Sequence, residues 1–322
     1  MRSAGGRYAL RRCVLAVPAL LGISLLTFAL LQVGPGGRVE AFARRNSAGP
    51  VPTAEEIAGA RHLLGVDRPL PIQYGRWLWH ALHGDLGTSD TTLRPVTSEI
   101  GEHFPYTVRL ALPAAVLALL VGIPFGVVSG MHHNRFVDRA LRFGAVAGAS
   151  MPSFWLGLLL IDLLAVHAHM FPAAGTEGLR SMVLPVITLA IGPAALLVRI
   201  TRSSLIETLG EDYVRTASAK GLRHQLVVER HALPNCLVPL LTVLGGIVGR
   251  LLVGAVIVET IFAWPGIGQL LLDGITRQDY PVVQGVILLS GALFVLLNLV
   301  VDVTYGFVDP RIDLAARRAA AP

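Results

Sequence analysis

The sequence predicts an all-α integral membrane protein with six transmembrane helices and both termini in the cytoplasm. The chain of 322 residues is 53% hydrophobic and only 15% charged, whereas soluble domains carry about a quarter of charged residues. Its apolar residues are gathered into long blocks rather than spaced at amphipathic intervals, which is typical of membrane spans. Its basic residues lie in short segments beside those blocks, so the net charge of +6 suits a membrane surface better than nucleic acid.

Six apolar blocks are each long enough for a span, since about 20 residues cross the hydrocarbon core of a bilayer. Prolines inside the blocks do not exclude helices, because kinked helices are tolerated in membranes. The first block resembles a secretory signal, but its apolar run exceeds the roughly 7–15 residues of a signal and ends without an A-x-A site. We therefore expect it to be a retained helix. The six predicted spans cover residues 13–33, 108–131, 141–166, 182–200, 237–259 and 282–307.

The distribution of arginine and lysine between the blocks predicts the orientation of the chain. The short outer loops hold only Arg180 and Arg277, whereas the short segments assigned to the inside are rich in arginine, as the positive-inside rule requires of cytoplasmic loops. The chain then divides into a cytoplasmic N-terminal segment (1–12), the first span (13–33), an extracytoplasmic loop with short helices (34–107), and a core transmembrane domain (108–322) that includes a cytoplasmic loop (201–236).

Two short helices are predicted in the outer loop. Thr53 followed by Glu56 is typical of a capping box, and Gly65 suits the end of that helix. A second helix is expected over residues 72–83, ending at Gly84. Neither the two cysteines nor the histidine pairs have the spacing of a closed metal site, so no metal is expected.

The polar segment EDYVRTASAKGLRHQLVVERHALPN, residues 211–235, separates the fourth and fifth apolar blocks and holds the only lysine of the chain. Residues 211–220 suit a short helix with Gly221 as its left-handed C′ residue, and residues 226–233 suit a second helix that ends near Pro234. Small residues would let another surface approach closely, and basic residues would bind a protein partner or lipid phosphates. These residues are Ala217, Ala219, Gly221, Arg215, Lys220, Arg223 and Arg230.

The spacing within this segment resembles the EAA loop of ABC-importer permeases, in which E-A-A is followed by three residues, a glycine, nine residues and I-x-L-P. Here Arg215-Thr216-Ala217 lies three residues before Gly221, and nine further residues lead to His231-Ala232-Leu233-Pro234. The form Y-V-R-T-A-x-A-K-G resembles the dipeptide/oligopeptide/nickel permease family in particular. Further segments are similar to that family: residues 65–78, 84–89, 184–209, 258–271, 277–289 and 298–312.

The resemblance implies the type I ABC importer permease fold, a multi-pass place in a bacterial inner membrane, and a short peptide as substrate, with a nickel chelate or another small solute as the alternative. It also implies a second homologous permease, two cytoplasmic ATPase subunits and an extracytoplasmic substrate-binding protein as partners. In such permeases the loop docks into a cleft of the ATPase. The residues that would carry this coupling are Tyr213, Arg215, Thr216, Ala217, Ala219, Lys220, Gly221, Leu233 and Pro234.

The chain has no phosphate-binding loop of its own, because its one lysine, Lys220, is not followed by serine or threonine after a glycine-rich turn. We therefore expect a transporter subunit rather than an enzyme, with no cofactor in this chain and ATP and Mg²⁺ on the partner ATPases. An intramembrane hydrolase would need a nucleophile elbow such as G-x-S-x-G, which the sequence lacks. A channel would need a selectivity filter, and nothing resembles one.

Two charged residues fall in the fifth span. Arg250 would cost about 2.5–3.5 kcal/mol at a helix centre, so we expect it either to line the translocation path with Gly249 and attract a carboxylate, or to form a buried pair with Asp162 or Glu259. Glu259, at the outer end of the span, would contact the binding protein or a gate, or simply lie at the membrane interface. The sequence leaves these alternatives open.

Overall fold

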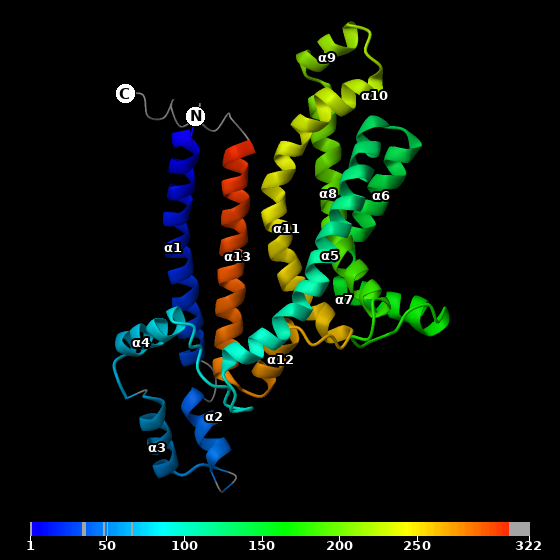
Figure 1. The fold of residues 1–322 in the computed structure, drawn as a ribbon. Helices are drawn as coiled ribbons and strands as arrows, with labels where there is room; N and C mark the ends of the chain where they lie inside the picture. The colour runs from blue at the N-terminus through cyan, green and yellow to red at the C-terminus, as the bar shows by residue number, and fades with distance from the viewer. Residues whose placement is uncertain (1, 34–36, 48, 50, 66, 309–322) are drawn as a thin grey trace. The chain divides into compact units, whose positions relative to one another are not determined.

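The computed structural model describes residues 2–33, 37–47, 49, 51–65 and 67–308, and this part of the chain is almost entirely helical (Figure 1). Its one β-type pairing is an isolated bridge between Thr88 and Pro95. The elements are α1 (Arg2–Val33), α2 (Gly37–Asn46), α3 (Ala54–Leu64), α4 (Leu70–Leu82), α5 (Val96–Met131), α6 (Phe136–Ser150), α7 (Ser153–Leu160), the π-helix η1 (Ile161–His167), α8 (Arg180–Leu209), α9 (Asp212–Ala219), α10 (His224–Val227), the π-helix η2 (Val228–Ala232), α11 (Leu233–Ile261), α12 (Ile267–Thr276) and α13 (Tyr280–Val308).

Four helices within the described residues are long and apolar enough to cross a membrane: α1, α5, α8 and α13. Helix α11 has 29 residues, which at 1.5 Å per residue is roughly 40 Å, also longer than the hydrocarbon core. Five of the six predicted spans therefore lie within single helices, and the internal prolines of α1 and α8 do not break them. The number of spans and the orientation of the termini stay predictions.

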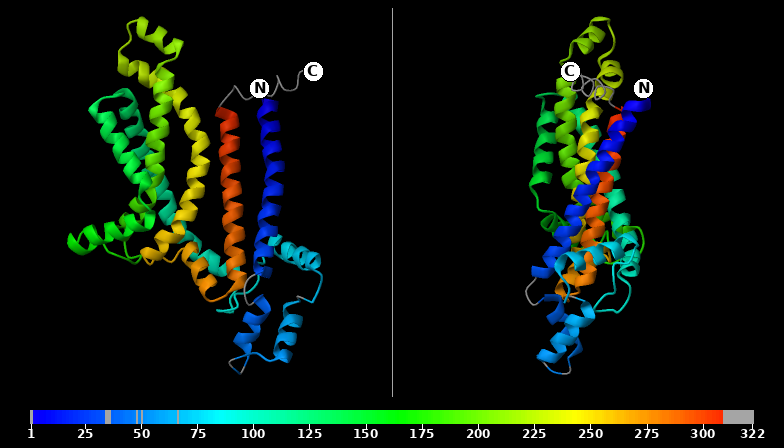
Figure 2. Two further views of the ribbon diagram at one scale, coloured as in Figure 1. Left: turned by 180° about the vertical axis from the view of Figure 1, so that it is seen from behind. Right: turned by 90° about the vertical axis from the view of Figure 1, so that its left-hand side faces the viewer.

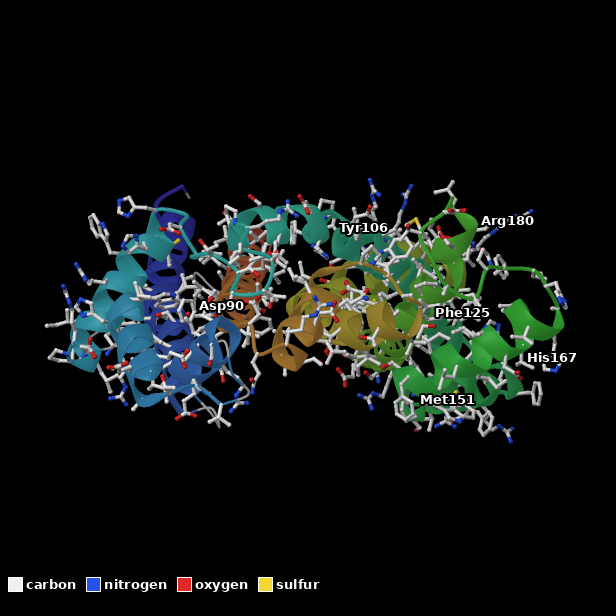
Figure 3. All side chains as sticks on the ribbon, turned by 90° about the horizontal axis from the view of Figure 1, so that it is seen from below. Asp90, Tyr106, Phe125, Met151, His167 and Arg180 are labelled. Carbon is white, nitrogen blue, oxygen red and sulfur yellow. The ribbon has the colours of Figure 1, made fainter. Side chains whose placement is uncertain are left out.

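The third predicted span, residues 141–166, is not one continuous helix. Helix α6 ends at Ser150, α7 begins at Ser153, and the axes of α6 and the α7–η1 segment differ by 103°. Pro152 explains the break, because it disfavours the helical conformation for the preceding residue, and Met151 is extended with φ −77° and ψ 123°. Figure 3 shows Met151 at the bend and His167 at the far end of the segment.

The chain forms two compact units. The first contains Met1–Val14, Thr107–Trp264 and Leu296–Pro322, and the second contains Leu15–Tyr106 and Pro265–Val295. In the first unit α8 packs against α6, α7 and α11. Helices α6 and α11 lie on opposite sides of α8 (Figures 1 and 2). The connection from α5 to α6 lies at the same end of this unit as α9 and α10 (Figure 1), as expected if both are cytoplasmic.

In the second unit, both short helices predicted in the outer loop are confirmed. The Thr53 side chain accepts a hydrogen bond from the Glu56 backbone N–H, Glu56 Oε2 accepts one from the Thr53 N–H at 2.7 Å, and Gly65 ends α3 at φ +65°. The next predicted helix is α4, which begins two residues earlier than expected, at Leu70. Helix α2 was not predicted.

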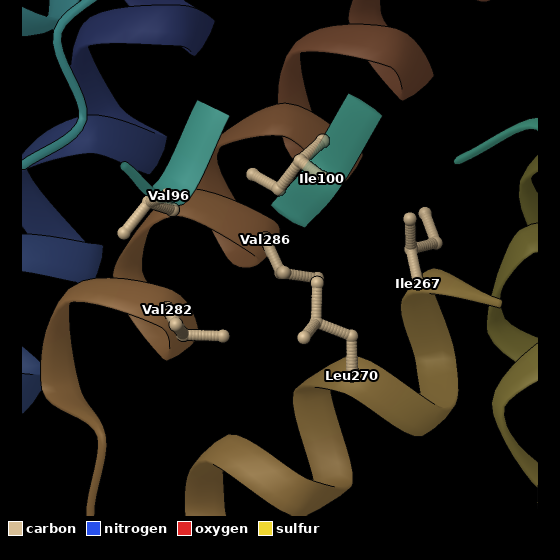
Figure 4. Packing of buried hydrophobic residues seen from close by; sticks show 6 residues of the cluster. All are labelled: Val96, Ile100, Ile267, Leu270, Val282 and Val286. Atoms are coloured by element: carbon tan, nitrogen blue, oxygen red, sulfur yellow. The ribbon is translucent and has the colours of Figure 1, made fainter. Parts of the chain in front are cut away.

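The core of the second unit is a cluster of branched aliphatic side chains. It joins the first turns of α5 to α12 and α13 (Figure 4). Gly285 of α13 allows the close approach, because a Cβ there would lie 2.6 Å from a methyl carbon of Val96. The buried members of the cluster are Val96, Ile100, Ile267, Leu270, Val282 and Val286.

A buried carboxylate fastens the loop before α5 to the start of α13. Asp279 is 3% exposed. It accepts hydrogen bonds from Ser89 Oγ at 2.6 Å and from the backbone N–H groups of Thr91 and Asp90 at 3.0 and 3.2 Å. Burial alone would raise the pKa of Asp279, but these donors together hold the pKa below its ordinary value. The loop thus depends on the ionised form.

Asp279→Asn is expected to destabilise the second unit at neutral pH by about 1.5–3 kcal/mol, because a charged acceptor is lost and an amide N–H₂ faces existing donors. The wild-type stabilisation is complete above the unfolded pKa of about 3.9 and is lost as the pH falls toward the lower folded pKa. Limited proteolysis of the loop around residue 90, across pH, measures this. At neutral pH the protease should cut the variant faster than the wild type. On acidification the cleavage rate should rise less for the variant than for the wild type. If the cleavage rates of the two proteins changed equally with pH, the ionised Asp279 would not be what holds the loop.

Candidate functional site

The polar segment after α8 forms a compact elbow, residues 210–232, in the first unit. Glu211 is extended with φ −71° and ψ 147°, which directs the chain out of α8 and into α9. Gly221 then adopts φ +80°, a left-handed conformation that glycine takes without steric cost, and the chain turns back into α10. The predicted helix over 211–220, with Gly221 after its end, is confirmed as α9.

The second helix of the segment differs from the expectation. It begins at His224 rather than residue 226, and it does not end near Pro234, because α10, η2 and α11 follow one another without interruption. Pro234 lies in the first turn of α11, where the missing N–H of proline is tolerated. The elbow is therefore joined directly to a helix of 29 residues, so a displacement of the elbow would displace α11 as well.

Two small apolar clusters hold the elbow on the helix ends. Val214, Ala217 and Val227 pack together against Leu209 of α8. The second cluster unites the ends of α5, α8 and α11 with η2. Its buried members are Leu205, Val228, Ala232 and Cys236, with Val127, Met131, Leu209 and Leu233 packed against them.

The predicted coupling residues divide into two groups. Tyr213, Arg215, Thr216, Ala219, Lys220, Gly221 and Pro234 are exposed, Leu233 is half-buried, and Ala217 is buried. Ala217 was expected to let a partner approach closely, but its small side chain instead packs inside the elbow with Val214, three residues earlier on the same helix face. The outer face of the elbow exposes Tyr213, Arg215 and Lys220.

No strong ion pair neutralises these cations within the described part of the elbow. Arg215 Nη1 lies 3.9 Å from Asp212 Oδ1, with both side chains largely exposed, and such surface pairs contribute little. The outer face is therefore available to an acidic or aromatic-lined partner surface.

The residues predicted for the translocation path lie on α11. Gly249 is buried, and the side chain of Arg250 lies outside the described residues, so its two alternatives stay predictions. Glu259 is fully buried, and its Oε1 accepts a hydrogen bond of 2.6 Å from Thr107 Oγ1. The alternatives for Glu259, a contact with the binding protein or a gate and a position at the membrane interface, stay predictions.

Glu259→Ala is expected to lower the amount of folded protein in the membrane, since it leaves a cavity and removes the acceptor of the buried Thr107 hydroxyl, a loss of about 1–3 kcal/mol. Glu259→Gln keeps the shape and an acceptor oxygen and should accumulate normally. Quantitative immunoblotting of membranes compares the two. Equal, wild-type amounts of both variants would show that the buried contact does not stabilise this unit.

Sequence reasoning missed a buried ion pair near the elbow. Asp138 of α6 is fully buried and accepts two hydrogen bonds from Arg202 of α8, at 2.6 Å from Nε and 2.9 Å from Nη2. The one signal in the sequence was an isolated acid in the basic stretch HHNRFVDRALR, residues 132–142.

A cavity of about 550 Å³ lies beside this pair, among α6, α7 and α8. Its wall is largely apolar and includes Gly148, Met151 and Pro193, and Arg142, Arg199 and Arg202 contribute cations to it. Clefts of this size and character hold small molecules. Sequence reasoning did not find it, because its lining comes from both sides of the unpredicted bend at Pro152.

Comparison with known families decides the class of the chain. The profile described as "Binding-protein-dependent transport system inner membrane component" matches residues 122–314, and the profile of its N-terminal region matches residues 6–111. The chain belongs to this family. The predicted resemblance is therefore confirmed, and the permease is a multi-pass component of a transport system.

Curated relatives of the permease are similar over nearly its whole length. It is 40% identical to the dipeptide transport system permease protein DppB of Escherichia coli K12, over 95% of this chain and 98% of the relative. It is 41% identical to the di/tripeptide transport system permease protein DppB of Pseudomonas aeruginosa, over 94% and 97%. It is 40% identical to the glutathione transport system permease protein GsiC of Salmonella paratyphi A, over 95% and 98%.

Solved structures confirm the fold class of the permease. The inward-facing MetNI methionine ABC transporter matches with a TM-score of 0.53 and 17% identity, over 65% of this chain and 96% of that chain. An amino acid ABC transporter crystallised with histidines matches with a TM-score of 0.51 and 16% identity, over 67% and 94%. The predicted all-α ABC importer permease architecture is thus confirmed.

Proposed function

We propose that the chain is a permease subunit of an ATP-driven importer and forms half of a translocation path for short peptides. The names of its curated relatives, which are dipeptide, di/tripeptide and glutathione permeases, support this substrate class. The alternative substrate, which the resemblance to the dipeptide/oligopeptide/nickel permease family also allows, is a nickel chelate or another small solute.

The elbow is the observation that carries the proposal. Its inner face is fixed to α5, α8 and α11 by two buried clusters, while its outer face exposes Tyr213, Arg215 and Lys220. A surface loop that only met lipid headgroups would not require such a rigid connection to three long helices. A loop that receives a push from a cytoplasmic ATPase would.

The proposed assembly contains this chain, a second homologous permease, two cytoplasmic ATPase subunits that hold ATP and Mg²⁺, and an extracytoplasmic substrate-binding protein, all at a bacterial inner membrane. The chain itself supplies no cofactor. Import would proceed by alternating access between inward-open and outward-open states.

Within the chain, Gly249 and Arg250 on α11 remain the proposed path residues, with Glu259 buried at the outer end of the same helix.

Uptake in a strain that lacks the chain tests the substrate. Restoring the chain should restore accumulation of a radiolabelled dipeptide, and an excess of unlabelled peptides should compete with it. Restored uptake of nickel without peptide uptake would replace the peptide with a nickel chelate as the substrate, and no uptake of either would reject the proposal.

Arg250→Ala is expected to reduce peptide uptake at unchanged protein level, because the arginine is proposed to attract the carboxylate of the peptide. Unchanged uptake and an unchanged substrate range would exclude Arg250 from the path.

A further inference from the structure

The Asp138 carboxylate is the meeting point of three elements in the first unit. Besides its two hydrogen bonds from Arg202, it accepts one from Ser129 Oγ of α5 at 2.6 Å and one from the Asn134 backbone N–H at 2.8 Å. Asn134 adopts φ +62° in the turn between α5 and α6. The four donors satisfy both carboxylate oxygens, as a buried charge requires. We call these residues, Ser129, Asn134, Asp138 and Arg202, the carboxylate clamp.

The clamp lies on the same stretch of α8 as the seat of the elbow. Arg202 precedes Leu205 by three residues and Leu209 by seven, so the three residues lie along one side of the helix. Leu205 and Leu209 both pack against the elbow clusters. Any displacement of the elbow therefore reaches the clamp within two helical turns.

A glycine stripe joins α5 to the same part of α8. A Cβ at Gly122, Gly126 or Gly130 would lie 2.5–2.9 Å from a side-chain carbon of Leu197, Thr201 or Leu205, respectively. The two helices thus meet almost backbone to backbone. The stripe secures α5 along α8, whereas the clamp adds a polar bridge from α8 to Asp138 of α6.

We propose that the carboxylate clamp couples the elbow to α6, so that α5, α6 and α8 move as one body when the elbow is displaced. Asp138 and Arg202 are positioning residues in this role. The proposal rests on the proposed function of the elbow as the ATPase contact. Without the clamp, α6 would be joined to α8 by apolar packing alone, so a movement of the elbow and α8 would reach α6 and the α6 wall of the cavity less completely.

The clamp contains its own matched control. Arg142 approaches the same Asp138 oxygen, but at 3.8 Å and with its side chain 50% exposed, whereas Arg202 is at 2.6 Å and 16% exposed. If a charge near Asp138 were sufficient, the two arginines would be equivalent. If the bidentate bridge between α6 and α8 matters, only Arg202 is required.

The experiment uses the whole transporter, with both permeases, the ATPases and the binding protein, in proteoliposomes. Uptake of a labelled dipeptide and ATP hydrolysis are measured on the same preparation for wild type, Asp138→Asn, Arg202→Met, Arg202→Lys and Arg142→Met. Asp138→Asn and Arg202→Met should still co-purify with the ATPases and hydrolyse ATP, but peptide imported per ATP should fall about fivefold or more, the usual scale of a lost coupling between sites. Arg202→Lys should recover part of this ratio, and Arg142→Met should keep it.

A role in folding alone gives a different result. Uptake and ATP hydrolysis would then fall together with the amount of complex, and the ratio of peptide to ATP would stay at the wild-type value, which overturns the proposal. If Asp138→Asn does not accumulate, Ser129→Ala, which removes one donor and keeps the ion pair, is judged by the same ratio. Wild-type proteoliposomes that import no peptide would instead refute the proposed function itself.

Discussion

Gly126→Ala is expected to prevent α5 from packing on α8 and to cause the largest loss of folded protein among single methyl additions to the first unit. The added Cβ would lie 2.5 Å from Thr201 Cβ and 2.9 Å from the Val198 carbonyl oxygen. Neither atom is the end of a flexible side chain, so the two helices would have to separate. Overpacking of this kind costs about 1–3 kcal/mol and occasionally more, and we expect the upper end of that range here.

Gly144→Ala on α6 is the matched control, because no atom lies within 4 Å of its added Cβ. Alanine is also the better helix former, by up to about 1 kcal/mol. The two variants are compared by heating the purified transporter in detergent and measuring, by size-exclusion chromatography, how much of it remains folded at each temperature. Gly126→Ala should unfold at a clearly lower temperature than wild type, and Gly144→Ala at the same or a higher one. Equal stability of the two variants would mean that α5 and α8 do not meet at the glycine stripe.

The long helices are predicted well from the sequence, because their apolar runs are longer than those of a signal peptide or of a helix in a soluble protein. The sequence does not predict the break within the third span, where Met151 before Pro152 is extended and the chain turns by 103°. Proline alone does not decide between the two outcomes. In α8, Pro185 and Pro193 remain inside one helix, so the result depends on the packing around each proline.

The elbow was predicted in part, for a similar reason. Its first helix and the left-handed glycine follow from local sequence, whereas the continuation of α10 into α11 depends on a π-helical segment that no local pattern indicated. The burial of Ala217 could have been inferred, since Val214 lies three residues earlier and marks the apolar face. The small side chain of Ala217 contacts Val214 and Val227 inside the elbow, whereas the sequence suggested that it would face a partner.

The charged residues of the first unit were the hardest to predict. Asp138 and Arg202 are 64 residues apart in the chain, and Thr107 and Glu259 are 152 apart. Only the packing of α6 on α8, and the fold of the whole unit, bring these groups together. Sequence can show that a buried charge needs a partner, but it does not identify that partner without the contacts between helices.

Gly221→Val is expected to abolish most transport while leaving the permease folded in the membrane. Gly221 has φ +80° with no atom within 4 Å of an added Cβ, so the cost is backbone strain alone, about 1–2 kcal/mol for a left-handed conformation and more for a β-branched residue. Strain of that size lowers the population of the native elbow by up to about 5–30-fold. Because a partner that binds only the native elbow sees its affinity reduced by the same factor, the ATPases should be lost on purification.

Gly178→Val separates this effect from general strain. Gly178 has φ +75° and equally open surroundings. It lies before the start of α8, whereas the elbow lies after the end of α8. Because α8 has 30 residues, these two ends are roughly 45 Å apart. Its valine variant should carry similar strain and still co-purify with the ATPases. Gly221→Asn, which tolerates the left-handed region better than valine, should restore part of the association. If Gly221→Val and Gly178→Val retained the ATPases equally, the native turn at Gly221 would not be what the ATPase recognises, and the elbow would have to act through its side chains alone.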